Sequence, residues 1–289
     1  MNYETLKKCN LCASRNIYAF DDAHNIWQCR DCGYVFDNPR PGWEDIKAFY
    51  SKTGKYDHWL RMEGAIDDLY KRRVDLIRRY KKEGSLLDIG TGWGQFLFWA
   101  KHYYNVTGTE ISQSAIRIAQ EKYGIALLKG ELQDFEFSKQ FDIITLLHVL
   151  EHLPDPAAVL RKCKELLKDD GILVVAVPNE ICGIRKILVR LLSLFKIGRF
   201  KNYGKIGLPK LALDGTLTEM HLSHFRTGVL RNFLKQNGFK VSDEALDPFY
   251  AAEGLNKIAH KTLYLICLAL KNITGINFYL GLWLVAKKA

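Results

Sequence analysis

The sequence contains no long hydrophobic run. None reaches the roughly 18–20 apolar residues that a membrane-spanning helix needs, and the first residues, MNYETLKK, lack the apolar core of a secretory signal peptide. It also lacks internal repeats and low-complexity segments. These absences predict a globular, cytoplasmic protein, and 289 residues are enough for one or two domains.

Acidic residues are fewer than basic ones, 32 against 42, and the net charge is +10. The excess favours an anionic partner, such as a nucleic acid, an acidic lipid surface or a phosphorylated substrate, and charge alone does not choose among them. The seven cysteines are an odd number, and four of them are clustered near the N-terminus. Clustering of this kind favours a metal site over disulfides.

The clustered cysteines form two Cys-x-x-Cys pairs, Cys9 with Cys12 and Cys29 with Cys32. This spacing is typical of a zinc ribbon, in which four thiolates close a tetrahedral structural site. We therefore expect a zinc ribbon over residues 1–40. A linker and helical cap should follow over 41–82, including a basic helix over 67–82.

The most informative stretch is Asp88-x-Gly90-x-Gly92-x-Gly94, between a short apolar run and a helix-compatible one. The pattern predicts a buried strand, a tight turn and a helix start. Gln95 stands where a nicotinamide-dinucleotide fingerprint requires its third glycine. Asp88 would repel a pyrophosphate but can accept a hydrogen bond from an ammonium group. The ligand indicated is a cationic nucleoside rather than a dinucleotide.

From residue 85 onward strands and helices alternate, which predicts an α/β fold with a doubly wound parallel sheet. Glu110 follows the second strand, roughly 20 residues beyond the glycine turn, where an acidic side chain can bind ribose hydroxyls. Strands are expected over 86–89, 106–109, 141–147 and 171–178, with helices over 95–102, 112–123 and 156–167.

The glycine motif resembles the first motif of class I S-adenosylmethionine (SAM) dependent methyltransferases, and the similarity extends from about residue 50 to the C-terminus. The segment Leu150-Glu151-His152-Leu153-Pro154-Asp155-Pro156 resembles that of the quinone-biosynthesis O-methyltransferases. The resemblance implies a Rossmann-like seven-stranded sheet with a SAM-binding core over 83–178. The activity it implies is in-line transfer of the SAM methyl group.

The resemblance also implies a set of cofactor-binding residues. Glu131 and Leu132 match the positions that meet the adenine, and Tyr50 and Tyr56 are candidate lid aromatics. The full set is Asp88, Gly90, Thr91, Gly92, Gly94, Glu110, Ile111, Glu131, Leu132, Leu147, His148, Tyr50 and Tyr56.

Histidine is suited to removing a hydroxyl proton because its pKa lies near neutrality. His148 and His152 are the first candidates for a general base, followed by His221 and His224. In some quinone-biosynthesis relatives a cluster like His148, Glu151 and His152 is linked to a divalent cation. His148 stands where that group carries an acid, which argues against metal assistance.

The chain lacks the Asn/Asp-Pro-Pro-aromatic motif with which many N-methyltransferases hold a planar amine. An oxygen acceptor is therefore favoured over carbon or nitrogen. The ribbon and front end resemble bacterial methyltransferases of surface-polysaccharide and small-molecule modification, which implies a sugar, glycolipid or other small-molecule acceptor. Two alternatives are an rRNA or tRNA methyltransferase, which the basic charge supports, and a non-catalytic SAM-fold binding protein.

After the fifth strand a basic insertion spans 179–217, with an amphipathic helix over 181–199. It fits a substrate lid, and its apolar face flanked by Lys and Arg also fits peripheral contact with an anionic membrane. Residues 218–289 are expected to complete the methyltransferase core. They include a helix over 263–270 that packs on the sheet and a strand over 278–286.

Overall fold

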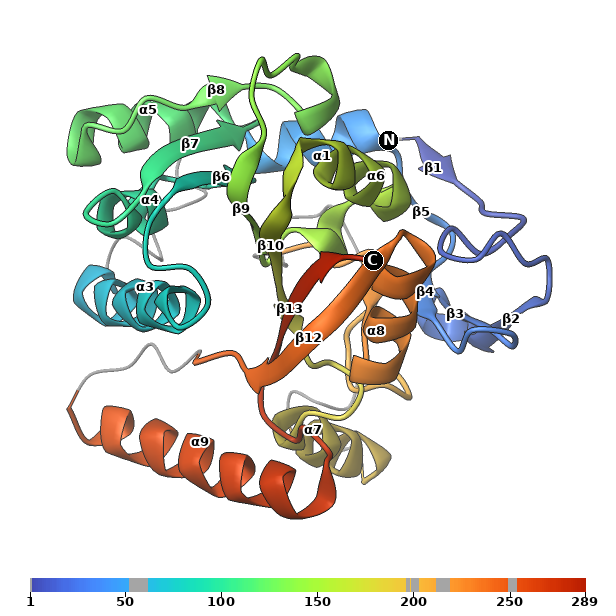
Figure 1. Cartoon of the computed structure of the whole chain (residues 1–289). Coiled ribbons are helices and arrows are strands. Elements are labelled where there is room, and N and C mark those ends of the chain that lie inside the picture. The colour runs from blue at the N-terminus through green and yellow to red at the C-terminus, as the bar shows by residue number, and fades with distance from the viewer. Residues whose placement is uncertain (1, 52–61, 196–197, 199–202, 212–218, 249–253) are drawn as a thin grey trace.

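A computed structural model describes the whole chain except residues 1, 52–61, 196–197, 199–202, 212–218 and 249–253 (Figure 1). Its centre is a seven-stranded sheet in the order β12-β13-β10-β9-β6-β7-β8. Strand β13 is antiparallel to both neighbours, whereas β8, β7, β6, β9 and β10 run parallel. The strands are β6 (Ser85–Ile89), β7 (Asn105–Glu110), β8 (Leu128–Lys129), β9 (Phe141–Leu147), β10 (Leu167–Pro178), β12 (Phe239–Leu246) and β13 (Gly281–Lys288).

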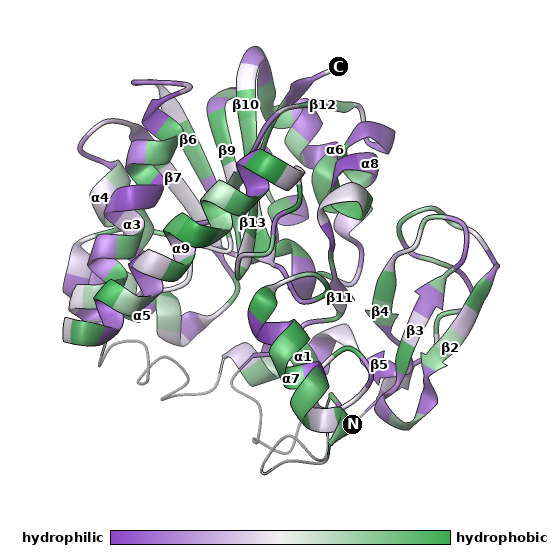
Figure 2. Ribbon diagram, turned by 90° about the horizontal axis from the view of Figure 1, so that it is seen from below, coloured by the Kyte–Doolittle hydropathy of each residue, from purple (hydrophilic) through white to green (hydrophobic). Residues whose placement is uncertain are grey.

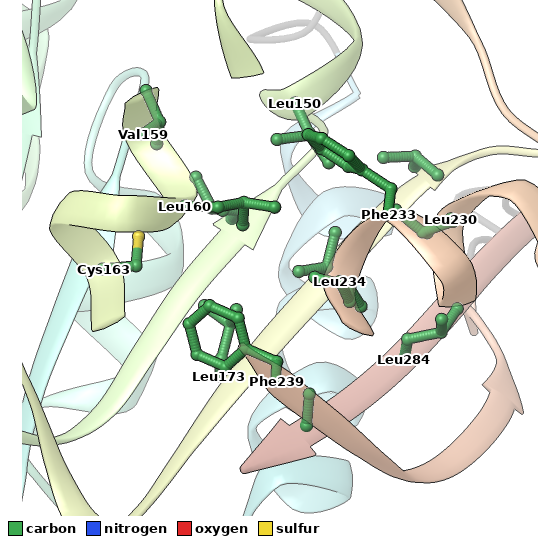
Figure 3. Close-up of a cluster of buried hydrophobic side chains, with 14 of the residues drawn as sticks. Leu150, Val159, Leu160, Cys163, Leu173, Leu230, Phe233, Leu234, Phe239 and Leu284 are labelled. Atoms are coloured by element: carbon green, nitrogen blue, oxygen red, sulfur yellow. The ribbon is translucent and has the colours of Figure 1, made fainter. Parts of the chain in front are cut away.

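Helices cover both faces of this sheet because its central strands are apolar on both sides. One face carries α3 (Glu63–Arg78), α4 (Gln95–Ala100) and α5 (Gln113–Tyr123), and the other carries α6 (Pro156–Leu166) and α8 (Thr227–Gln236) (Figure 1). Figure 3 shows leucine and phenylalanine side chains of α6, α8 and the strands packed together on the second face.

Two helices begin directly after residues whose side chains cap a helix N-terminus. Ser112 precedes α5, and its hydroxyl accepts a hydrogen bond from the backbone N–H of Ala115 at 3.3 Å. Asp155 does the same for α6 through Ala158, and Pro156 occupies the first turn, where its missing N–H is not needed.

The N-terminal ribbon does not form a sheet of its own. Its strands β2 (Ile17–Asp21), β3 (Ile26–Cys29) and β4 (Val35–Asp37) are completed by β11 (Ser223–His224), a strand from the far end of the chain. The hydroxyl groups of Tyr34 and Ser223 are also hydrogen-bonded. The ribbon is thereby joined to the C-terminal part of the chain, which completes the seven-stranded sheet.

The remaining elements connect these layers. They are β1 (Tyr3–Glu4) paired with β5 (Arg40–Pro41), helices α1 (Trp43–Tyr50), α7 (Ile184–Leu194) and α9 (Gly254–Thr274), and the 3-10 helices Asp22–His24, Leu132–Asp134 and Leu150–His152. In the described part of the chain no helix has the length and apolarity to cross a membrane.

The structure confirms the expected α/β class and its sheet. It adds β11 and β12, which the sequence pattern did not predict. The expected helix over 263–270 belongs to a longer one, which runs from Gly254 to Thr274. Its one fully buried residue, Cys267, packs with Leu246 at the end of β12 and with Tyr279.

Candidate functional site

A cavity of about 310 Å³ opens where β6, β7 and β9 end. The carboxyl ends of parallel strands are the usual place for ligands in such sheets. Eleven of the predicted cofactor residues line it: Tyr50, Asp88, Gly90, Thr91, Gly92, Glu110, Ile111, Glu131, Leu132, Leu147 and His148. His152 lines it too, whereas Gly94, His221 and His224 do not. Tyr56 lies outside the described residues.

The three glycines of the turn have different roles, although all have positive φ, at +66°, +62° and +81° for Gly90, Gly92 and Gly94. A Cβ on Gly90 would lie 2.7 Å from a methyl group of Val149, and one on Gly94 would lie 2.8 Å from Cβ of Ala119. Both glycines therefore serve close packing. A Cβ on Gly92 would meet nothing within 4 Å. Gly92 is the glycine of this turn that leaves room for a ligand.

Two buried carboxylates flank this turn. Glu110 accepts hydrogen bonds from the backbone N–H groups of Gly92 and Ser112, each at 2.7 Å, so the turn fixes its position. Asp88 accepts a hydrogen bond from the Thr145 hydroxyl at 2.6 Å. Burial raises the pKa of both carboxyls, that of Asp88 to about 7. Because desolvation penalises their negative charge, a bound cation would stabilise both.

Helix α1 closes one side of the cavity. The indole N–H of Trp43 donates to Glu131 at 2.7 Å, and the ammonium group of Lys47 lies 3.5 Å from the same oxygen. Trp43 lines the cavity beside Glu131. Trp43 was not predicted from the sequence, since a tryptophan that opens a short helix has no distinguishing spacing.

On the other side, His152 lines the cavity, and its Nε2 lies 3.8 Å from a Glu151 oxygen. Its Nδ1 faces the carbonyl oxygen of Met220 and lies 3.0 Å from the Tyr50 hydroxyl. Because a carbonyl only accepts hydrogen bonds, Nδ1 carries the proton, and Nε2 holds a lone pair when the ring is neutral. Burial lowers the pKa of His152, which keeps the ring neutral.

His148 differs because both of its ring nitrogens face carboxylates. Nε2 is 2.9 Å from Asp247, and Nδ1 is 3.5 Å from Glu151. Burial would lower the pKa of His148, but hydrogen bonding to Asp247 and Glu151 outweighs it and raises the pKa to about 8. The ring is therefore an imidazolium at neutral pH. Its backbone is left-handed, with φ at +60°, a strain typical of functional sites.

Arg73 fixes the position of Asp247. Its guanidinium group donates two hydrogen bonds to Asp247, at 3.0 and 2.6 Å, and both side chains are buried. The sequence analysis missed this pair. A signal for Arg73 existed, because it falls on the same helical stripe as Ile66, Leu69 and Ile77, and a cation on an apolar stripe requires a buried partner.

Glu180 connects the other two candidate histidines. Nδ1 of His221 lies 3.0 Å from one Glu180 oxygen, and Nδ1 of His224 lies 2.6 Å from the other. Nε2 of His224 contacts Asp37 of the ribbon at 2.7 Å. Burial opposes protonation of His224, but Asp37 and Glu180 raise its pKa to about 9. His224 therefore bridges ribbon and core as a buried cation, away from the cavity.

His221 stands next to His152, with 4.9 Å between the ring centroids. Together with Glu151 they form a group of three side chains whose ligand atoms all lie within 4.8 Å of one another. The cluster that the structure brings together thus contains His221 in place of His148.

The four ribbon cysteines converge as their spacing predicted. Sγ of Cys9 is 3.7 Å from Sγ of Cys32, and Sγ of Cys12 is 3.6 Å from Sγ of Cys29. All four sulfurs lie within 4.8 Å of one another, and none is in a disulfide. A tetrahedral zinc with Zn–S bonds of about 2.3 Å separates its sulfurs by about 3.8 Å. The thiol geometry therefore fits one zinc ion.

The profile of a family described as a methyltransferase domain matches residues 56–244, more than half of the chain. The chain belongs to this methyltransferase family. The match confirms the resemblance to class I SAM-dependent methyltransferases and the kind of cofactor expected in the cavity.

Related sequences agree with this family. A ubiquinone biosynthesis O-methyltransferase from Actinobacillus pleuropneumoniae is 33% identical over 124 residues, which cover 37% of this chain and 53% of that protein. A protein of the same name from Colwellia psychrerythraea is 27% identical over 166 residues, covering 55% and 61% of the two chains. The chain thus spans about half the length of the curated relatives it matches.

Solved structures share the fold at low identity. Magnesium protoporphyrin IX methyltransferase from Synechocystis PCC 6803, with bound S-adenosylhomocysteine, gives a TM-score of 0.51 at 15% identity, covering 84% of this chain and 98% of that one. A SAM-dependent methyltransferase from Archaeoglobus fulgidus gives 0.51 at 19% identity, covering 80% and 99%. These similarities establish the fold alone.

Gly92 provides a direct test of where the methyltransferase binds SAM. We expect Gly92→Ala to weaken SAM binding at least about tenfold in calorimetry, because the new methyl group enters the space left for the ligand. The control is Gly124→Ala at the end of α5, which has the same left-handed backbone, φ +61°, and equally open space. Both should lose about 1–2 kcal/mol of stability from backbone strain. Equal SAM affinity in the two variants would contradict the assignment.

Proposed function

We propose that this methyltransferase transfers the methyl group of SAM to a hydroxyl oxygen of a small molecule, with His152 as the general base. The observation that carries the proposal is that one cavity joins the glycine turn and its two carboxylates to a neutral histidine. The acceptor oxygen attacks the sulfonium methyl in line as S-adenosylhomocysteine leaves. The hydroxyl proton passes to Nε2 of His152.

Alignment supplies much of the rate in such a transfer because SAM is already activated, and effective molarities of about 10⁵ M or more show what alignment can give. Asp88, Glu110 and Glu131 would hold the ammonium, ribose and adenine ends of SAM. His152 is favoured as base over His148, because the two carboxylates beside His148 keep that ring protonated at neutral pH. His221 and His224 do not line the cavity.

Two features support a small acceptor with a nucleophilic oxygen. The curated relatives named above are called O-methyltransferases of ubiquinone biosynthesis, which points to a phenolic hydroxyl. The chain also lacks the amine-holding motif of N-methyltransferases. A sugar or glycolipid hydroxyl would undergo the same chemistry.

The base is tested with His152→Gln and release of S-adenosylhomocysteine on a panel of a catechol, a polyhydroxylated sugar and total tRNA. We expect turnover of a small hydroxyl acceptor to fall about 10²–10⁴-fold in the variant, with SAM affinity nearly unchanged. His102→Gln, at an exposed position, is the matched control. Unchanged turnover in His152→Gln would refute the base, and methylation of tRNA alone would refute the acceptor class.

We further propose that Cys9, Cys12, Cys29 and Cys32 bind one structural zinc ion. Four protein ligands leave no open coordination position, so the ion would stabilise the ribbon rather than catalyse. The ribbon is too small for a core of its own, and metal binding would supply much of its folding free energy. Because β11 pairs with β4, losing the ribbon structure would also expose the core beside His224.

The purified protein should contain one zinc per chain by elemental analysis. Cys12→Ser should lower both the zinc content and the melting temperature of the whole chain, since ribbon and core share a sheet. Cys163→Ser, at a buried cysteine of α6, is the control that changes a thiol without changing zinc content. The proposal would be contradicted if the purified wild type contained no zinc and Cys12→Ser melted at the same temperature as the wild type.

A further inference from the structure

Helix α9 carries an apolar stripe on the side that faces away from the protein. Its packed side holds Leu263, Tyr264 and Cys267. The exposed residues are Leu255, Ile258, Leu265, Ile266 and Ile273, and their spacings of three, seven and eight place them together on the opposite side of the helix. A surface helix normally has polar residues there. Leu255 and Ile273 are 84% and 81% exposed.

Helix α7 also has a narrow buried side opposite an exposed apolar stripe. Val189 is its only fully buried residue, and Ile184, Leu188 and Leu191 form an exposed apolar stripe on the far side that Phe195 continues. Leu188 is 55% exposed and Phe195 is 75% exposed. Among the described residues of 179–211 none lines the cavity, so α7 does not serve as the wall of the SAM site.

The two helices lie on the same side of the molecule. Figure 2 shows α7 and α9 on the side turned toward the viewer, with hydrophobic residues in each. The backbone N–H of Ile184, which starts α7, donates to the carbonyl of Phe278, just beyond the end of α9, at 2.7 Å. The start of α7 is thus anchored to the segment that follows α9. We call them the α7–α9 surface.

Neither helix contains an acidic residue. Their cations are Arg185, Lys186, Arg190, Lys257, Lys261 and Lys271. Lys186 pairs with Glu180, and Lys257 with Asp68. No described acidic side chain forms an ion pair with Arg185, Lys261 or Lys271. The stripes therefore lie beside positive charge that has no negative partner on either helix.

We infer that the α7–α9 surface docks on an anionic lipid bilayer, with both helices lying in the interfacial plane. Exposed leucine and isoleucine side chains beside Lys and Arg are the pattern of interfacial helices. A second copy of the chain, docked through the same surface, would bring cation against cation, since neither helix carries an acidic residue. Nucleic-acid phosphates would match the cations but would leave the apolar stripes in water. The inference does not depend on the acceptor or the base.

The test is flotation of the full chain with vesicles of phosphatidylglycerol and phosphatidylcholine, compared with phosphatidylcholine alone. The wild type should partition onto the anionic vesicles, and more weakly at high salt. Leu188→Glu/Ile258→Glu, one change on each stripe, should reduce partitioning about a hundredfold. Tyr3→Glu/Tyr103→Glu adds the same charge at exposed positions on other elements and should float like the wild type.

Equal flotation of the wild type and Leu188→Glu/Ile258→Glu would overturn the inference. So would a dimer in sedimentation velocity that the same variant converts to a monomer without any vesicle binding, because the surface would then join two copies. SAM calorimetry on the variant should give the wild-type affinity. That measurement distinguishes a failed membrane surface from a failed SAM site.

Discussion

Two carboxylates buried at the ends of neighbouring strands are the constraint on which the site depends. Asp88 and Glu110 are 3% and 6% exposed, and burial raises the pKa of each. The backbone N–H groups of Gly92 and Ser112 compensate part of the desolvation cost at Glu110. The Thr145 hydroxyl compensates part of the cost at Asp88. The part of the desolvation cost that is not compensated favours a ligand with positive charge and with ribose hydroxyls. SAM has both.

The same use of buried charge extends to the acceptor side. Arg73, Asp247 and His148 form one chain of contacts, and Asp37, His224 and Glu180 form another that ends at His221. The second chain begins in the ribbon and ends beside His152. The ribbon therefore supports the site, because its strand β4 and the carboxylate of Asp37 hold residues 220–224 in place. The carbonyl of Met220 in that segment contacts the proposed base, His152.

Much of the cofactor side was predictable because its signals are local. Asp88, the glycines and Glu110 sit at fixed distances along one strand-turn-helix unit and the next strand, and the family resemblance assigned them roles. The acceptor side was harder, since Arg73 and Asp247 are 174 positions apart and no spacing links them. Strand β11 has two residues, too few for any periodicity. Gly94 belonged to the motif but serves helix packing, which only the position of Ala119 reveals.

In the proposed SAM site, the buried Asp88 carboxylate would bind the cationic end of the cofactor. Calorimetry of SAM binding as a function of pH tests it most directly. Because the pKa of Asp88 is raised to about 7 in the free protein, affinity should fall as the pH drops below that value, approaching about tenfold per pH unit. Asp88→Asn should bind weakly and without this dependence. Wild-type affinity in Asp88→Asn, or pH-independent binding by the wild type, would contradict the account.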